Sequence, residues 1–227
     1  VVSICNGVNA QPVAELAVMH MLTAYRHFGE LVERAKSGSK DTADIAGRSW
    51  LISGKRVGFV GMGNIGKRVA KAVQGFGAEV VYYDPFRLPE DLEKELGFTF
   101  MPLEDVLKTS DIISLHVPLM DSTEHMINKE TISLMKPSAL IINTARGGII
   151  NTEDLLEALK EGRIFGASVD TIEGEPLPAG HPAYSEPRLT ITPHAGGNTE
   201  DNNSNMANYI MDNFDSMEAG KGPNPRS

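Results

Sequence analysis

The sequence predicts an α/β fold in which helices cover both faces of a doubly wound parallel sheet. Short apolar runs alternate with helical segments along most of the 227 residues. Each run is apolar throughout instead of at every second position, which is typical of strands buried on both faces of a parallel sheet. One of these runs, at residues 57–60, leads directly into a glycine-rich turn. In sheets of this kind, ligands bind at the edge where the strands end.

The glycine-rich turn has the spacing Gly61-x-Gly63-x-x-Gly66 and separates the strand at 57–60 from a helix at 67–76. Gly61 permits a tight turn, Gly63 lets the backbone approach a pyrophosphate, and Gly66 lets the helix pack close to the strand. The free N–H groups and the positive dipole at the start of that helix favour phosphate binding. The turn therefore predicts a dinucleotide site.

A second strand, at 79–83, ends at Asp84, 18 residues after Gly66. A carboxylate at this point can accept hydrogen bonds from an adenosine ribose, and it would repel a 2′-phosphate. The sequence therefore predicts NAD as the cofactor in preference to NADP. Arg87, three residues further on, could soften this preference. Strand, glycine turn, helix, strand and acid in this order are much more specific than the glycine spacing alone.

The residues before this unit predict a long helix at 11–36, with a strand-like run and a turn at 1–10 and a polar connection at 37–54. Apolar side chains lie on nearly all sides of the helix, so it needs packing partners on several sides. Two interpretations are equally supported. The helix is either a central core helix or a subunit interface, because it is not a crossover of the nucleotide-binding unit. The second interpretation predicts a homodimer.

The residues after the unit continue the alternation of helices and strands. Pro102 opens one helix at the position where proline costs least. Asn151 caps another helix, which has acidic residues in its first turn. The predicted strands are 98–101, 111–117, 139–143, 165–169 and 189–192, and the predicted helices are 88–96, 102–108, 129–135, 152–160 and 199–217.

Composition and charge exclude several classes of partner. A formal net charge of −9, with no basic run longer than two residues, argues against nucleic-acid binding. The one cysteine, Cys5, cannot form a disulfide within the chain, which favours a reducing, cytoplasmic setting. No apolar run approaches the length of a membrane span, and no metal site is expected. The chain begins at Val1 without a signal-peptide pattern, as expected for a piece that starts partway through a longer protein.

Polar residues mark the ends of the predicted strands, namely Asp84, His116, Thr144, Asp170 and His194. Because parallel strands end at one edge of a sheet, these residues are candidates for ligand binding by position alone.

Three residues near this edge form a candidate catalytic group. Taken singly, Arg146 could be a surface arginine, Glu175 a solvated loop acid and His194 a histidine that closes a strand. Hydride transfer to a keto acid needs a cation for the carboxylate, a proton donor that titrates near neutral pH, and an acid that keeps the donor charged. Arg146, His194 and Glu175 fit these three roles in that order.

Several runs of the chain together resemble the NAD-binding domain of the D-isomer-specific 2-hydroxyacid dehydrogenase family, which includes D-lactate, D-3-phosphoglycerate and glyoxylate or hydroxypyruvate enzymes. The runs span nearly the whole chain and are very specific in combination. They are 9–15 (NAQPVAE), 61–66 (GMGNIG) with Asp84, 115–119 (LHVPL), 142–148 (INTARGG), 170–176 (DTIEGEP) and 192–197 (TPHAGG).

The resemblance implies a Rossmann-like NAD-binding domain of an enzyme that interconverts a 2-keto acid and a D-2-hydroxy acid. It implies that Arg146 binds the substrate and that His194 is the acid/base group paired with Glu175. Asp170 would face the nicotinamide carboxamide. The implied NAD site is lined by Gly61, Gly63, Asn64, Ile65, Gly66, Asp84, His116, Val117, Pro118, Thr144, Ala145, Arg146, Asp170, His194, Gly196 and Gly197.

The resemblance also implies a domain organisation. Residues 1–197 would be the NAD-binding domain, with the helix at 11–36 at its hinge and dimer interface. A C-terminal helix within 198–219 would return to pack on a second, substrate-binding domain of about one hundred residues, which this chain lacks, and 220–227 would be a loose tail. Part of the apolar face of the returning helix would then be uncovered, at Met206, Ile210 and Phe214.

Two positions bear on the branch of the family. Glu175 stands where a related formate dehydrogenase has glutamine, because formate oxidation needs no proton transfer, so that reaction is not expected here. Asn6 stands where relatives commonly have proline, a difference that affects the hinge and not the chemistry.

Two other interpretations are compatible with the sequence. Transcriptional corepressors share this fold and its three catalytic residues, so an NAD(H)-sensing interaction protein with little turnover is an alternative. The lack of long low-complexity arms argues against it. The chain by itself would also be a fragment that binds NAD without turning over a substrate. The identity of the keto acid is not encoded here, because the side-chain pocket in this family is built largely by the second domain.

Overall fold

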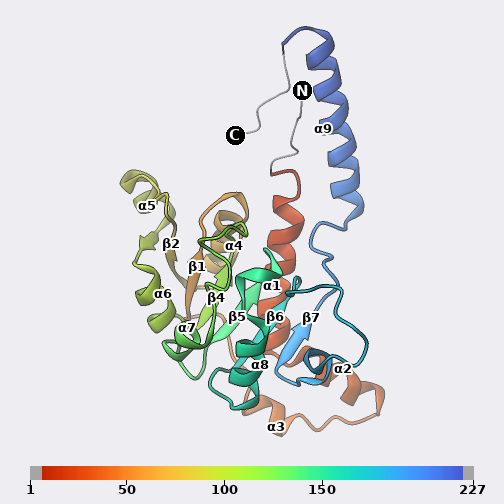
Figure 1. Ribbon diagram of the computed structural model, residues 1–227. Coiled ribbons are helices and arrows are strands. Elements are labelled where there is room, and N and C mark those ends of the chain that lie inside the picture. The colour runs from red at the N-terminus through yellow and green to blue at the C-terminus, as the bar shows by residue number, and fades with distance from the viewer. Residues whose placement is uncertain (1–6, 222–227) are drawn as a thin grey trace.

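The computed structural model describes residues 7–221. Within this range the chain forms a seven-stranded sheet in which all neighbouring strands are parallel, in the order β3-β2-β1-β4-β5-β6-β7 (Figure 1). The predicted doubly wound parallel sheet is confirmed. The predictions for residues 1–6, including Cys5 and Asn6, and for the tail at 222–227 lie outside the described residues. The strands are β1 (Arg56–Val60), β2 (Glu79–Tyr83), β3 (Phe98–Phe100), β4 (Ile112–Leu115), β5 (Leu140–Asn143), β6 (Gly166–Val169) and β7 (Leu189–Ile191).

The strands end together at one edge of the sheet. Val60, the last residue of β1, pairs with Tyr83 and Leu115, the last residues of β2 and β4. The same register continues from Leu115 to Asn143 of β5 and from there to Val169 of β6. Between β1 and β4 the chain reverses its progress across the sheet, and in this architecture the crevice at such a reversal holds the ligand.

Helices lie on both faces of the sheet (Figure 1). Side chains of α1 and α4 join one hydrophobic core, whereas side chains of α6, α7 and α8 join the other. The helices are α1 (Ala10–Tyr25), α2 (Phe28–Lys36), α3 (Ala43–Ala46), α4 (Asn64–Gly75), α5 (Glu90–Leu96), α6 (Leu103–Thr109), α7 (Lys129–Ser133), α8 (Thr152–Lys160) and α9 (Glu200–Glu218), with short 3₁₀ helices η1 (Gly147–Ile149) and η2 (Pro182–Ser185).

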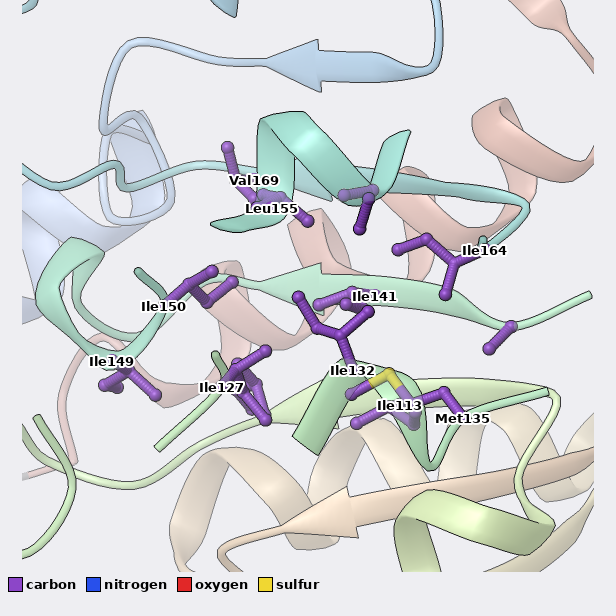
Figure 2. Close-up of a cluster of buried hydrophobic side chains, with 14 of the residues drawn as sticks. Ile113, Ile127, Ile132, Met135, Ile141, Ile149, Ile150, Leu155, Ile164 and Val169 are labelled. Carbon is purple, nitrogen blue, oxygen red and sulfur yellow. The ribbon is translucent and has the colours of Figure 1, made fainter. Parts of the chain in front are cut away.

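Successive side chains of the central strands enter opposite cores. Ile113 of β4 and Ile141 of β5 lie in the core of α7 and α8 (Figure 2), whereas Ile112 and Ile142 lie in the core of α1 and α4. All four side chains are fully buried, and burial of each contributes roughly 1.5–3 kcal/mol. These strands are apolar at most positions on both sides because both faces of the sheet are covered.

The long helix predicted at 11–36 is wrong in one respect, because the structure divides it into α1 and α2 at His27. This residue has a left-handed backbone conformation with φ of 48°, which no α-helix accommodates. The break is held by a distant segment: the Trp50 amide donates to the Tyr25 carbonyl (2.9 Å) and the His27 ring is hydrogen-bonded to the Arg48 carbonyl (3.1 Å). The helix pattern of residues 11–36 contains no sign of this tertiary contact.

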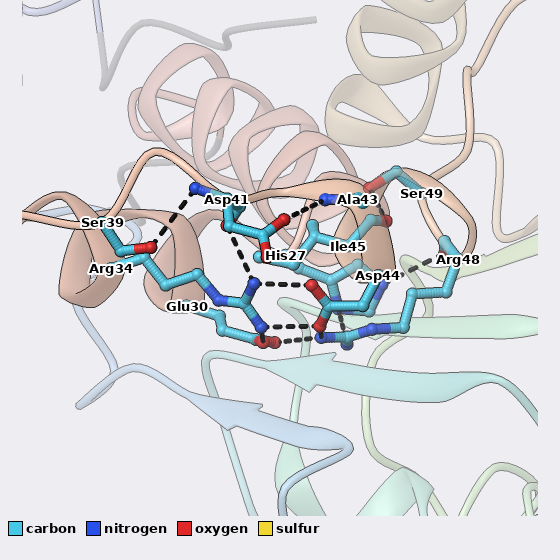
Figure 3. A network of polar contacts seen from close by, with 10 residues as sticks. All are labelled: His27, Glu30, Arg34, Ser39, Asp41, Ala43, Asp44, Ile45, Arg48 and Ser49. Carbon is cyan, nitrogen blue, oxygen red and sulfur yellow. Dashed lines mark hydrogen bonds and ion pairs between the residues drawn. The ribbon is translucent and has the colours of Figure 1, made fainter.

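The connection predicted at 37–54 contains a short helix, α3, which ion pairs join to α2 (Figure 3). Arg34 of α2 contacts Asp44 of α3 (2.6 Å) and Glu30 of its own helix (2.9 Å), and Arg48 also pairs with Glu30. The Arg34 guanidinium lowers the pKa of Asp44 to about 2. These ion pairs lie at the surface, where a single pair contributes little to the free energy of folding. They therefore determine the path of the segment more than they stabilise it.

The first part of the predicted N-terminal helix, α1, has a buried face and an exposed face. Ala14, Ala17 and Met21 of α1 are buried in the core, whereas Met19 and Leu22 are exposed. The core interpretation is therefore confirmed for the first face.

The C-terminal helix α9 begins where the sequence predicts. The Thr199 hydroxyl accepts a hydrogen bond from the Asn202 amide (3.1 Å) and caps the helix. Ile210 and Phe214 are exposed and Met206 is half-buried. The packing of this helix on a second domain stays a prediction. No helix within residues 7–221 is long and apolar enough to cross a membrane.

Candidate active site

The glycine turn after β1 forms the floor of the candidate site. Gly61 has φ of +97°, and a Cβ there would lie 2.7 Å from the carbonyl carbon and oxygen of His116. A Cβ on Gly66 would lie 2.5 Å from the carbonyl oxygen of Gly61, whereas a Cβ on Gly63 would meet nothing within 4 Å. Packing within the protein therefore requires the first and third glycines, and the second faces open space above the start of α4.

Asp84 holds the glycine turn against the end of β2. One carboxylate oxygen accepts from the Met62 amide (2.7 Å) and the other from the Phe86 amide (2.8 Å). Both oxygens keep further lone pairs, and the residue is half-buried. Asp84 is therefore fixed in place with acceptor capacity to spare, as a ribose-binding carboxylate requires.

The side chain of His116 is turned into the protein. Its Nε2 lies 2.8 Å from the Ser114 hydroxyl, and its ring stacks on Phe59 at 5.8 Å. Burial lowers the pKa of His116, so the ring is neutral at pH 7. The backbone of His116 and Val117 thus lies beside Gly61, and Pro118 follows Val117 in the chain.

The end of β5 presents a buried hydroxyl without a partner. Thr144 is 7 % exposed, and its Oγ1 makes no hydrogen bond within residues 7–221. The backbone around it is fixed by Asn143, whose side chain accepts from the Ala145 amide (3.0 Å) and donates to the Arg146 carbonyl (2.9 Å). A buried hydroxyl left unpaired is costly, so Thr144 fits a site that an external ligand completes.

Two of the three candidate catalytic residues are in direct contact. Nδ1 of His194 lies 2.7 Å from Oε1 of Glu175, and the Glu175 side chain also accepts from the Ile172 amide (3.3 Å). The His194 backbone is left-handed (φ 52°), and its amide donates to the Asp170 carbonyl (2.9 Å). Nε2 of His194 has no partner among the described residues, and the side chain is 52 % exposed. The outer ring nitrogen is therefore free to exchange a proton with a ligand.

Arg146, the third candidate, contacts neither of the other two. Its side chain is exposed and makes one hydrogen bond, to the carbonyl of Ala145 (2.7 Å). It has no carboxylate partner among residues 7–221. The loop that carries it abuts the loop that leads to Glu175, because a Cβ on Gly147 would collide with the Ile172 carbonyl carbon.

Asp170 shapes the loop that carries His194. Its buried carboxylate accepts from the Thr192 hydroxyl (2.5 Å), the Ala195 amide (2.9 Å) and the Gly196 amide (2.8 Å). All these bonds lie within the protein, so Asp170 positions the neighbouring chain in addition to any contact with a ligand. Gly197 follows at the end of this loop.

His20 of α1 extends the same hydrogen-bond network and was missed by the sequence interpretation. The ring is buried, with Nε2 3.0 Å from the Thr192 hydroxyl and Nδ1 in contact with the Ser168 hydroxyl. Thr192 gives its one proton to Asp170, so Nε2 of His20 must donate. Burial lowers the pKa of His20, against an opposing effect of Asp170. The available signal was a lone histidine on the apolar face of a helix.

A second histidine–glutamate pair lies close to the first and was also missed. Nε2 of His125 lies 2.6 Å from Glu173, and the His125 amide donates to the Gly148 carbonyl (2.8 Å). The other oxygen of Glu173 accepts from the Thr152 amide at the start of α8 (3.4 Å). The hydrogen bond to Glu173 raises the pKa of His125. This pair ties together the loops that carry Arg146 and Glu175.

The fold is that of a dinucleotide-binding α/β domain, and a histidine–glutamate pair lies at the edge where its strands end. No group of three or more His, Cys, Asp or Glu side chains in the described part of the chain is placed to bind a metal. Residues 18–196 match the family described as D-isomer specific 2-hydroxyacid dehydrogenase, NAD binding domain. The chain belongs to this family.

Named relatives agree with the family assignment. The chain is 37 % identical over 219 residues to a glyoxylate reductase of Korarchaeum cryptofilum, covering 96 % of this chain and 66 % of that protein. It is 40 % identical over 195 residues to a hydroxypyruvate reductase of Thermotoga maritima, covering 85 % and 62 %. The crystal structure of D-lactate dehydrogenase with NAD⁺ from Lactobacillus jensenii matches with a TM-score of 0.84 and 32 % identity, over 94 % of this chain and 67 % of that chain.

The chain spans about two thirds of the length of these relatives. The assignment of the chain to this family therefore rests on the NAD-binding domain.

Proposed function

We propose that this chain is the cofactor-binding part of an NAD-dependent oxidoreductase that interconverts a 2-keto acid and a D-2-hydroxy acid. The observation that carries the proposal is the contact of His194 with Glu175, which leaves Nε2 of the histidine unpaired among the described residues at the edge where the strands end. A histidine oriented by a carboxylate is a common arrangement for transferring a proton near neutral pH.

The residues at the strand ends fit a dinucleotide. Gly63 leaves space for a pyrophosphate at the start of α4, and Asp84 offers a fixed carboxylate to the ribose. Thr144 offers a hydroxyl that has no partner within residues 7–221. The carboxylate of Asp84 favours NAD, because a 2′-phosphate beside it would add like charges. The residues proposed to hold NAD are Gly61, Gly63, Asn64, Ile65, Gly66, Asp84, His116, Val117, Pro118, Thr144, Ala145, Arg146, Asp170, His194, Gly196 and Gly197.

The cofactor and three side chains each have a separate role in the proposed reaction. When bound, the reduced nicotinamide supplies the hydride. His194 donates a proton from Nε2 to the oxygen of the keto group as that oxygen gains charge, and it takes the proton back in the oxidative direction. Glu175 holds the ring by Nδ1 and stabilises its charged form. Arg146, free of any protein carboxylate in the described chain, binds the substrate carboxylate.

The names of the relatives indicate which class of substrate should be tested first. Two of them are named for the reduction of glyoxylate and hydroxypyruvate, which are small 2-keto acids. We propose an acid of this size class as the substrate. The part of the enzyme outside this chain would complete the pocket that binds it.

A homodimer is part of the same proposal. Exposed apolar side chains gather on α1, the start of α2 and the segment before β1, at Met19, Leu22, Phe28, Trp50 and Leu51. An exposed apolar surface of this kind is typical of a subunit contact. Gel filtration with light scattering at micromolar concentration tests it, and a monomer alone would contradict it.

The full-length protein provides the test of the reaction. NADH oxidation is followed with glyoxylate, hydroxypyruvate, pyruvate, 3-phosphohydroxypyruvate and branched-chain or aromatic 2-keto acids, with formate and NAD⁺ as the control reaction. The proposal expects turnover of at least one keto acid and none of formate. NADH binding without turnover of any of these acids would contradict it and favour a nucleotide-sensing protein.

A further inference from the structure

Arg87 lies three residues after the ribose-binding candidate Asp84, but its guanidinium is already engaged. Nε donates to one oxygen of Glu93 (2.9 Å) and Nη2 to the other (2.8 Å). The guanidinium carbon also lies 5.1 Å from the centre of the Phe100 ring. A planar, two-point contact of this kind is the strongest form of an arginine–carboxylate pair.

Glu93 is held in place from the other side as well. Its side chain is 9 % exposed, and it accepts a hydrogen bond from the Tyr82 hydroxyl (2.6 Å). The Tyr82 oxygen accepts in turn from the Leu88 amide (2.9 Å). The hydrogen bond from Arg87 lowers the pKa of Glu93 to about 2, so this acid is ionised at any working pH. The partner of Arg87 is therefore a fixed, charged carboxylate on α5 that is also hydrogen-bonded to Tyr82 of β2.

This pairing matters because Arg87 is the one basic residue in the segment 84–93, which contains four acids. A phosphate on the ribose would carry a charge of roughly −1.5 to −2 and would need a cation with free donors in a fork geometry. With Glu93 bound to it, Arg87 presents two fewer donors and no net charge to such a group.

We propose that Glu93 is a specificity-determining residue that acts through Arg87: by binding the guanidinium it withholds the local cation from the ribose 2′ position and reinforces the choice of NAD over NADP made by Asp84. The inference rests on the proposed function, because it assumes that the dinucleotide lies along the glycine turn. Glu93 itself is a positioning residue and touches no ligand.

A cycle of variants in the Asp84→Asn background tests the role of Glu93, since that background removes the direct repulsion of a 2′-phosphate. Binding of NADPH and NADH to the 227-residue chain is measured by calorimetry at low salt. Glu93→Gln is expected to raise the affinity for NADPH about tenfold, which is about 1.4 kcal/mol, and to change the affinity for NADH less than about twofold. When Arg87→Gln is added, the gain is expected to vanish, and no gain with Arg87 present would overturn the inference.

Two measurements separate this effect from simpler ones. Glu95→Gln removes the same charge from the same helix at an exposed position, and an equal gain of NADPH binding there would show a general electrostatic effect and overturn the inference. Arg87→Gln with Glu93 intact is expected to leave NADPH affinity unchanged. A tenfold loss would show that Arg87 already reaches the phosphate and would overturn the inference, and this arm can be measured even if Glu93→Gln does not fold.

The cofactor controls distinguish this inference from the proposed function. Failure of the unmodified chain to bind NADH would overturn both. Normal NADH binding with no effect of Glu93→Gln on NADPH would overturn the inference and leave the proposed function intact.

Discussion

Nδ1 of His194 lies 2.7 Å from Oε1 of Glu175, while the opposite ring nitrogen has no partner in the described chain. The histidine arrives on the loop after β7 and the glutamate on the loop after β6, so the parallel register of the sheet brings them together. The loop carrying His194 is shaped by the buried carboxylate of Asp170. The pair is thus a consequence of strand order together with one buried acid.

Replacing Glu175 by glutamine tests the charge of this pair. The amide oxygen can still accept from Nδ1, but it no longer stabilises a charged ring. We expect reduction of the keto acid by the full-length enzyme to slow about tenfold or more, since each factor of ten is about 1.4 kcal/mol of barrier. Glu173→Gln is the matched control, because it removes the same charge two residues earlier from a different histidine. Equal losses in both variants would contradict a specific role for Glu175.

Alanine substitutions in the glycine turn should separate packing from ligand binding. Gly61→Ala should destabilise the fold, because its Cβ would lie 2.7 Å from the His116 carbonyl at a left-handed φ. Gly63→Ala should keep the melting temperature but weaken NADH binding, since its Cβ enters open space above α4. Thermal unfolding and calorimetry measure the two effects. Unchanged NADH affinity in Gly63→Ala would place the pyrophosphate elsewhere.

The buried network of His20 should support the His194 loop. His20→Leu leaves the hydroxyls of Ser168 and Thr192 without this partner, and a buried polar group left unpaired costs about 1–3 kcal/mol. We expect a loss of this size in urea unfolding of the chain. Met21→Leu, a buried neighbour of similar volume, is expected to cost less than about 1.5 kcal/mol. A His20→Leu chain as stable as the parent would show that the network contributes nothing.

The two structural histidines should give stability of opposite pH dependence. Glu173 raises the pKa of His125, so its contribution is full below the unfolded value of about 6.5 and is lost as pH rises through the folded pKa. Because burial lowers the pKa of His20, its contribution is full above about 6.5 and falls as pH drops below that value.

Unfolding free energies from pH 5.5 to 8.5 check this. His125→Gln should lower the free energy of unfolding more at the acid end of this range. The difference should be less than about 1 kcal/mol because the pair is partly exposed. His20→Gln should cost more at the alkaline end. A difference from the parent that is flat with pH in both variants would contradict the assignment.

Local patterns predicted most of the fold. The all-apolar runs located the strands, and the spacing of Gly61, Gly63 and Gly66 located the turn, because each depends only on residues near in the chain. The strand ends then placed His194 and Glu175 at one edge. The break at His27 was not predictable in this way, because it depends on hydrogen bonds to residues 48–50.

The missed residues share this cause. His20 and Thr192 are 172 positions apart in the chain, and His125 and Glu173 are 48 apart. Neither pair has a spacing that a helix or a turn would produce. Likewise, the sequence suggested that Arg87 could soften the cofactor preference, whereas its capture by Glu93 depends on how α5 packs beside β2.

The most direct test of the central claim is single-turnover oxidation of bound NADH by full-length His194→Ala, with the keto acid that the parent enzyme reduces. We expect a rate about 10²–10⁴ times slower, with NADH still bound. A normal rate in this variant would show that His194 does not transfer the proton, and the proposed mechanism would be wrong.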